Sequence, residues 1–329
     1  MKKTTRNDVA RVAGVSPTVV SYVLNNSNYV SEEKRKAVLD AVKALDYSPN
    51  RFAQGLRTNH SSTIALIGDS LQRELFESLS IRLLNRGFYT SLFFARLDDL
   101  FIQRLISGQF DAVFMTSNGF TSQQLNRIVD SGTPMILYKS RIYQDLSPEI
   151  VSMAPDTYDS VLQAMRYLIE KGHRRIAYIP PLRYRTQGLG GDDFRVQAYA
   201  QALETNGLPA DPDLVCTATD SVSSIEESLR RMLALPQGRP TALVVGDDDL
   251  AAQLMQYLRT LHYSIPEEIA VVGWGDIPSA RITTPQLTTV SAGIQEFAAC
   301  AADSLVCLAE GARPEDRFFP VRLVVREST

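Results

Sequence analysis

Two stretches of this sequence carry residue types that could do catalytic chemistry. The run Asp247-Asp248-Asp249 could supply carboxylates to a metal ion, and Gly188-Leu189-Gly190-Gly191 could wrap a phosphate. Neither run has the flanking pattern of an established motif, and the chain, with three histidines, carries no Ser/His/Asp or Cys/His signature. The sequence therefore favours a binding protein over an enzyme, with no catalytic residues, metal or cofactor expected.

The first 25 residues carry a different chemistry. An apolar stripe at helical spacing leads up to Gly14, which suits a left-handed turn, and a second stripe follows Ser16 and Pro17. Ser16 suits a helix N-cap and Pro17 the first helical position. With a third amphipathic stretch over residues 31–45, the pattern predicts three short helices, the second of which would enter the major groove of DNA. A helical hairpin with no nucleic-acid role remains the alternative on spacing alone.

The distribution of charge favours DNA binding. Residues 1–60 contain ten Lys and Arg against five Asp and Glu, a net charge of +5, whereas the whole chain carries −3 and the remainder therefore −8. A basic head on an acidic body is expected when only the head meets phosphate.

These residues also carry a family resemblance, which continues through most of the chain. The head resembles the headpiece of the lactose-repressor (LacI/GalR) family in the runs Asp8-Val9-Ala10-Arg11-Val12-Ala13-Gly14-Val15-Ser16, Val23-Leu24-Asn25, Val30-Ser31-Glu32 and Tyr47-Ser48-Pro49-Asn50. Further runs in the body include Gly172-His173-Arg174-Arg175-Ile176-Ala177, Val271-Val272-Gly273-Trp274 and Leu287-Thr288-Thr289-Val290. The resemblance implies a transcriptional regulator, most commonly a repressor released by an inducer.

The resemblance implies a set of DNA-contacting residues in the head and in a hinge over residues 49–61. Pro17, Thr18 and Tyr22 are expected to read bases. Many family members have arginine in place of Tyr22, and tyrosine cannot make the two-pronged contact of arginine with guanine. Leu56 matches the hinge leucine that wedges into the minor groove, although an ordinary linker residue is the alternative. The remaining contacts are expected at Arg6, Ser16, Ser21, Asn25, Asn50, Ala53 and Arg57.

From residue 62 onward, short apolar runs alternate with amphipathic helical stretches. This alternation predicts α/β architecture with two parallel sheets and a break near residues 155–160. The family fold agrees, since it has two lobes resembling periplasmic binding proteins joined by three connections. We expect a headpiece over 1–48 and a body over 62–329, with lobe one about 62–156 plus 291–319 and lobe two about 157–290 plus 320–329. The expected strands are residues 63–68, 89–94, 111–115, 134–138, 150–153, 175–179, 214–218, 242–246, 269–274 and 321–325. The expected helices are residues 74–86, 99–107, 122–131, 159–171, 194–206, 224–235, 248–262 and 295–310.

The resemblance places a small-molecule effector between the lobes. Arg195 matches the central effector-binding arginine of the family, and a surface arginine is the alternative. Asp247, Trp274 and Arg185, with Thr186 beside it, are further candidates, while Asp248 is expected to cap a helix. Gly275 and Lys139 stand where the family usually has aspartates. We expect a sugar or sugar derivative. Because these changes remove two carboxylates and add a cation, they favour an anionic one, such as a sugar phosphate or a carboxylate.

The remaining features concern location and assembly. No apolar segment follows Lys2 and Lys3, and no run reaches membrane-spanning length, so a cytoplasmic protein is expected. The three cysteines fit a reducing compartment. A solute-binding protein without a DNA role is the rival class, but it would need export. Because the chain stops after its last strand, without the extra helix of tetrameric relatives, we expect a homodimer on a pseudo-palindromic operator.

Overall fold

The computed structural model describes residues 4–25, 28–47, 60–70, 72–182 and 191–329. Its contacts divide the chain into two units, Met1–Ser61 and Ser62–Thr329. In the described residues, no helix is both long and apolar enough to cross a bilayer.

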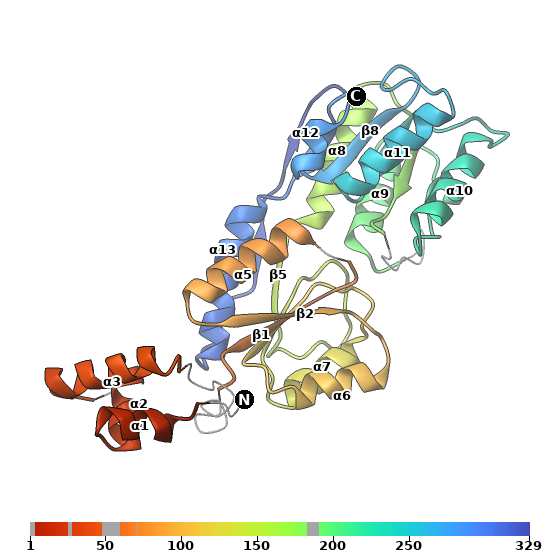
Figure 1. The fold of residues 1–329 in the computed structure, drawn as a ribbon. Helices are drawn as coiled ribbons and strands as arrows, with labels where there is room; N and C mark the ends of the chain where they lie inside the picture. The colour runs from red at the N-terminus through yellow and green to blue at the C-terminus, as the bar shows by residue number, and fades with distance from the viewer. Residues whose placement is uncertain (1–3, 26–27, 48–59, 71, 183–190) are drawn as a thin grey trace. The chain divides into compact units, whose positions relative to one another are not determined.

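The first unit is a cluster of short helices, α1 (Arg6–Ala13), α2 (Pro17–Asn25) and α3 (Glu32–Ala44) (Figure 1). Gly14 ends α1 with φ +65°, and the Ser16 hydroxyl oxygen accepts a hydrogen bond from the Val19 amide at 3.3 Å, as expected of an N-cap. The three apolar stripes meet in one small core made of Val9, Ala10, Val20, Val23, Val30, Val38 and Ala41. The predicted helical head is confirmed.

The second unit contains two sheets, each covered by helices on both faces (Figure 1). The first sheet has the strand order β10-β5-β4-β3-β1-β2 and is parallel throughout. Helices α5 (Arg73–Asn85) and α13 (Ile294–Ala309) pack on one face, and α6 (Asp99–Ser107) and α7 (Ser122–Asp130) on the other. Its strands are β1 (Thr63–Gly68), β2 (Tyr89–Phe94), β3 (Ala112–Met115), β4 (Met135–Leu137), β5 (Val151–Pro155) and β10 (Arg317–Phe319).

The second sheet has the order β11-β9-β8-β7-β6. Helices α8 (Thr157–Glu170) and α9 (Phe194–Thr205) cover one face, and α10 (Val222–Leu233) and α11 (Asp248–Thr260) the other. Only the edge strand β11 runs antiparallel among the described strands of this sheet. Its strands are β6 (Ile176–Ile179), β7 (Ala242–Val245), β8 (Ala270–Gly275), β9 (Thr288–Ser291) and β11 (Arg322–Val324).

The chain passes between the sheets three times, after β5, after β9 and after β10. The structure thus confirms an α/β body of two lobes built on parallel sheets. One predicted strand, residues 214–218, is wrong. Pro212 begins a short 3-10 turn there (η2, Pro212–Leu214), and only Val215 makes an isolated bridge to Tyr178 at the edge of β6. Strands β9 and β10 and the short helix α12 (Pro278–Ile282) were not predicted.

Candidate functional site

The start of α2 presents the residues expected to read DNA. Thr18 is exposed there, while Pro17, Ser21 and Tyr22 are half-buried. The Tyr22 ring packs against the small core of the head, so part of this side chain serves packing. Thr18 is therefore the most accessible of these residues for contact with bases.

The other expected DNA contacts are less fully described. Arg6 lies half-buried in the first turn of α1, and Ser16 is exposed, with its hydroxyl oxygen bound to the α2 backbone. The side chain of Asn25, and all of Asn50, Ala53, Leu56 and Arg57, lie outside the described residues. The hinge stays a prediction for this reason.

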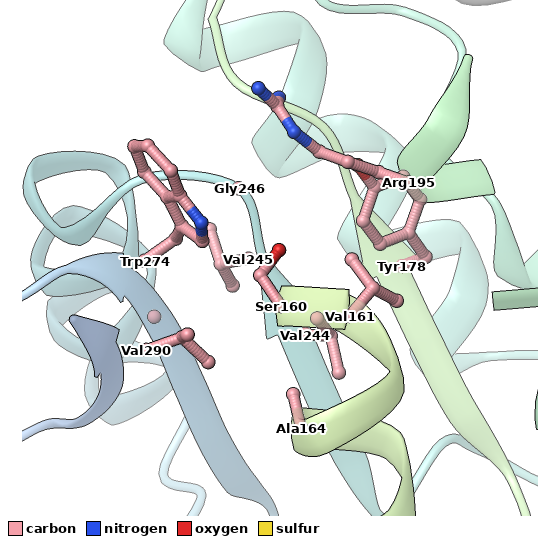
Figure 2. A pocket seen from close by; sticks show the side chains of 11 residues that line it. Ser160, Val161, Ala164, Tyr178, Arg195, Val244, Val245, Gly246, Trp274 and Val290 are labelled. Carbon is pink, nitrogen blue, oxygen red and sulfur yellow. The ribbon is translucent and has the colours of Figure 1, made fainter. Parts of the chain in front are cut away.

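The second unit contains a pocket above the carboxyl ends of its parallel strands, with an empty volume of about 240 Å³ (Figure 2). Ligands of open α/β sheets typically bind at this edge. Helix α8 and strands β6 to β9 supply the floor, α9 supplies Arg195, and the end of β8 supplies Trp274. The lining residues are Ser160, Val161, Ala164, Tyr178, Arg195, Val244, Val245, Gly246, Gly273, Trp274 and Val290.

Arg195 and Trp274 form the polar part of this pocket. The Arg195 guanidinium carbon lies 5.6 Å from the Trp274 ring centroid, within the range of a cation–π contact. Arg195 is only 4% exposed. Its place at the start of α9 is fixed because the Asp193 side chain caps the helix and accepts the Arg195 backbone amide at 2.8 Å. The Trp274 ring packs against the cores of both lobes, which fixes its orientation.

The loop after β4 brings the first lobe to the same region. Burial raises the pKa of Tyr138 to about 12, and the neighbouring Arg195 charge and hydrogen bond oppose that rise, so Tyr138 is a neutral phenol beside the guanidinium. The Ile142 amide donates to the Asp192 carbonyl at 2.8 Å. The Arg141 guanidinium forms an ion pair with Asp192. The two lobes are thus joined directly at this rim of the pocket.

The two neighbouring aspartates at the start of α11 differ in position, because Asp247 caps the helix and Asp248 is buried. Asp247, predicted to contact the effector, is the N-cap, and its carboxylate accepts the Leu250 amide at 2.8 Å. The prediction that Asp248 caps the helix is wrong. Asp248 is fully buried and accepts the Thr289 hydroxyl at 2.6 Å and the Ile277 amide at 3.0 Å. Burial raises the pKa of both carboxyls, that of Asp248 to about 6.

The remaining expected effector residues do not line the described pocket. Gly275 follows Trp274 with φ +126°, a backbone conformation that residues with a side chain rarely adopt. An aspartate at this position would therefore be strained. Lys139 is half-buried beside Tyr138. Arg185 lies outside the described residues, as do Thr186 and two of the three glycines at 188–191.

Two residues that line the pocket, and Tyr138 beside Arg195, were missed in the sequence. Tyr138 follows β4 directly, Tyr178 lies in β6, and Ser160 lies in the first turn of α8, donating its hydroxyl to the Thr157 carbonyl at 2.6 Å. Their positions at the carboxyl ends of strands and the start of a helix were the available signal. The acidic run at 247–249 forms no metal site, because no group of three His, Cys, Asp or Glu among the described residues could hold an ion.

Comparison with known proteins identifies the family. A family model described as bacterial regulatory proteins, lacI family, matches residues 5–50, and one described as a periplasmic binding protein-like domain matches residues 165–329. The HTH-type transcriptional repressor PurR of Pectobacterium atrosepticum is 30% identical over 297 residues, which are 87% of this chain and 84% of that protein. This chain belongs to the lacI family of bacterial regulatory proteins.

Further transcriptional regulators extend the comparison. The HTH-type transcriptional regulator GalS of Salmonella typhimurium is 32% identical over 91% of this chain and 88% of that protein. A structure of the transcriptional regulator CelR in complex with cellobiose has a TM-score of 0.67 at 28% identity, over 99% of this chain and 100% of that one. A Lac repressor dimer bound to operator and the anti-inducer ONPF has a TM-score of 0.81 at 23% identity, over 100% of this chain and 99% of that one, which shows the shared fold. The resemblance found in the sequence is confirmed.

Proposed function

We propose that this lacI-family regulator acts in the cytoplasm as a homodimeric repressor, in which a small molecule bound beside Arg195 changes the affinity for operator DNA. Each head would place α2 in the major groove, so that two heads read a pseudo-palindromic site. The expected hinge residues would complete the DNA contacts. The effector would be a sugar-sized molecule held between the lobes.

The observation that carries this proposal is the position of Arg195. It lies in the pocket of the second lobe, and the same side chain contacts Tyr138 of the first lobe. A ligand that contacts Arg195 would therefore touch the place where the lobes meet. Because a ligand shifts an equilibrium only through different affinities for two states, this is where binding can favour one angle between lobes.

The relatives support repression, a dimer on operator DNA and a small-molecule ligand. PurR is named as a repressor, the Lac repressor structure contains a dimer with operator, and the CelR structure contains cellobiose. The expected direction is release of DNA by the effector, the commoner family behaviour. A solute-binding protein without a DNA role is not favoured, because the family model for the DNA-binding head matches residues 5–50.

The test is fluorescence anisotropy of the full chain on its own promoter DNA, at fixed salt, with and without a panel of sugars, sugar phosphates and carboxylates. We expect binding at least ~1000-fold tighter than to random DNA of equal length, and weaker in the presence of one compound. Tighter binding with a compound would identify a corepressor instead. Equal affinity for promoter and random DNA would refute the regulator mechanism.

A matched pair of variants separates DNA reading from general damage. Thr18→Ala removes an exposed hydroxyl at the start of α2, and Thr205→Ala removes one at the end of α9 in the other unit. Thr18→Ala should reduce the preference for promoter over random DNA, by about fivefold or more. Thr205→Ala should leave that preference unchanged. Equal loss in both variants would argue against readout by α2.

A further inference from the structure

Hydrogen-bond donors dominate the polar part of the Arg195 pocket. Arginine and the tryptophan indole can donate hydrogen bonds but cannot accept them. The Trp274 Nε1 atom is buried and has no hydrogen-bond partner among the described residues, and Figure 2 shows it turned toward the Ser160 side of the pocket. The Ser160 hydroxyl gives its proton to the Thr157 carbonyl, which leaves an oxygen that can accept at this wall. The ligand group that fits the Arg195 and Trp274 donors is one that accepts.

Carboxylates are missing from the described lining of the pocket. The Asp247 carboxylate accepts a backbone amide as the cap of α11, and the Asp248 carboxylate accepts two donors from other elements. A neutral sugar presents hydroxyls that both donate and accept, and its donors would find few partners on these walls. The lining therefore favours an acceptor-only group over a set of hydroxyls.

The charge near the pocket fits a single negative charge. Arg195 is the one cation in the described lining, and Asp247 lies close enough for the two charges to influence each other. A phosphate dianion would face one cation with a carboxylate nearby. A planar carboxylate can accept two parallel hydrogen bonds from one guanidinium, and it carries only one negative charge.

The floor of the pocket is apolar and small. Val161, Ala164, Val244 and Val290 are at most 4% exposed and lie beneath the polar pair (Figure 2). The space between these side chains is narrow, since its empty volume of about 240 Å³ includes the open mouth of the pocket. This floor suits a compact body that offers an apolar face, such as one face of a six-membered ring.

We infer that the effector is a small monocarboxylic acid, with its carboxylate between the Arg195 guanidinium and Trp274 Nε1 and an apolar face of its body on the valine floor. The inference rests on the proposed function of this pocket as the effector site, and it makes Trp274 a specificity-determining residue. Gly275 supplies no carboxylate at the adjacent position, which keeps this end of the pocket open to an anion.

The experiment uses the full chain without DNA, so that a failure of effector class is separate from a failure of DNA binding. Trp274 is the only tryptophan, and its fluorescence therefore reports the pocket directly. The probes are two matched pairs, glucuronate with glucuronamide and benzoate with benzamide, together with glucose and glucose 6-phosphate. Each amide keeps the body of its acid and removes the charge.

We expect a saturable change in fluorescence with at least one acid at millimolar concentration, and at least about tenfold weaker binding of its amide. Calorimetry on variants then assigns the contacts. Arg195→Gln should weaken the acid at least about tenfold, and Trp274→Phe, which keeps an aromatic ring without the N–H, about fivefold. Arg195→Lys keeps the charge but cannot make two parallel hydrogen bonds to a carboxylate. Its affinity for the acid should therefore lie between those of wild type and Arg195→Gln.

Arg230 provides a matched control, because it stacks on Tyr257 at 5.8 Å in a similar arrangement outside the pocket. Arg230→Gln should leave binding unchanged. The inference is overturned if the amide binds as well as the acid, if glucose or glucose 6-phosphate binds more tightly than every acid, or if no acid gives a saturable change. Specific DNA binding released by a neutral sugar would overturn this inference and leave the regulator function intact.

Discussion

Replacing Asp248 by asparagine should make the stability of the second unit less dependent on pH. The Asp248 side chain is fully buried, and burial raises its pKa from 3.8 to about 6, with the nearby Asp247 and Asp276 carboxylates adding to the rise. The Thr289 hydroxyl and the Ile277 amide partly offset it by donating to the carboxylate. In the folded protein this group therefore holds its proton more tightly than in the unfolded chain.

The sign and size follow from this difference in pKa. A group with a raised folded pKa contributes its full stability below the unfolded value, near pH 3.8, and loses it as the pH rises through about 6. At about 1.4 kcal/mol for each tenfold change in the dissociation constant, the total loss is about 3 kcal/mol. Asparagine does not titrate, and its amide can still accept from the Ile277 amide and donate to the Thr289 hydroxyl.

The assay is urea unfolding followed by Trp274 fluorescence, at several pH values between about 4 and 7. The free energy of unfolding of Asp248→Asn, relative to wild type, should rise by about 2–3 kcal/mol across this range. Asp249→Asn is the control, because Asp249 is exposed on the same helical turn. A difference between Asp248→Asn and wild type that stays constant with pH would refute the reasoning.

Three further substitutions test packing, backbone and the contact between lobes. A Cβ on Gly273 would lie 2.2 Å from Asp248 Oδ1, so Gly273→Ala should lower the urea midpoint and shift the Trp274 emission. Gly14 has φ +65°, and a Cβ added there would meet no atom within 4 Å. Gly14→Ala should therefore lower the unfolding free energy of the head by about 1 kcal/mol through backbone strain alone, and Gly14→Asn should lower it less. Thermal unfolding measures both. Arg141→Gln and Asp192→Asn should each lower the free energy of unfolding of the second unit, because the two side chains form a half-buried ion pair. A double-mutant cycle should give a coupling energy of about 1 kcal/mol. Additive effects of the two substitutions would contradict the ion pair.

Much of the fold could be predicted from local patterns. Strand β1 (Thr63–Gly68) and helix α6 (Asp99–Ser107) fall on the predicted residues, because the first is a continuous apolar run and the second has an apolar stripe at helical spacing. Gly14 and Ser16 likewise occupy the predicted turn and cap. These features depend on interactions within a few residues of sequence.

Strand β9 shows where that approach fails. Thr288 and Thr289 are fully buried in the middle of a sheet, where their hydroxyls bond to Thr329 and Asp248. In the sequence they are two polar residues after a proline, and no apolar alternation marks them. A buried hydroxyl is stable only when distant partners satisfy it, and those partners lie about 40 residues away in the chain.

The sequence alone determined the family, the helical head and the two α/β lobes, since these follow from motifs, charge and local periodicity. Tertiary structure decided which side chains share the pocket. Arg195 and Trp274 are distant in sequence and meet because α9 begins and β8 ends at the same edge of one sheet. The same packing made Asp247 the helix cap and buried Asp248, because burial and hydrogen-bond partners are set by the surrounding elements and not by residue type.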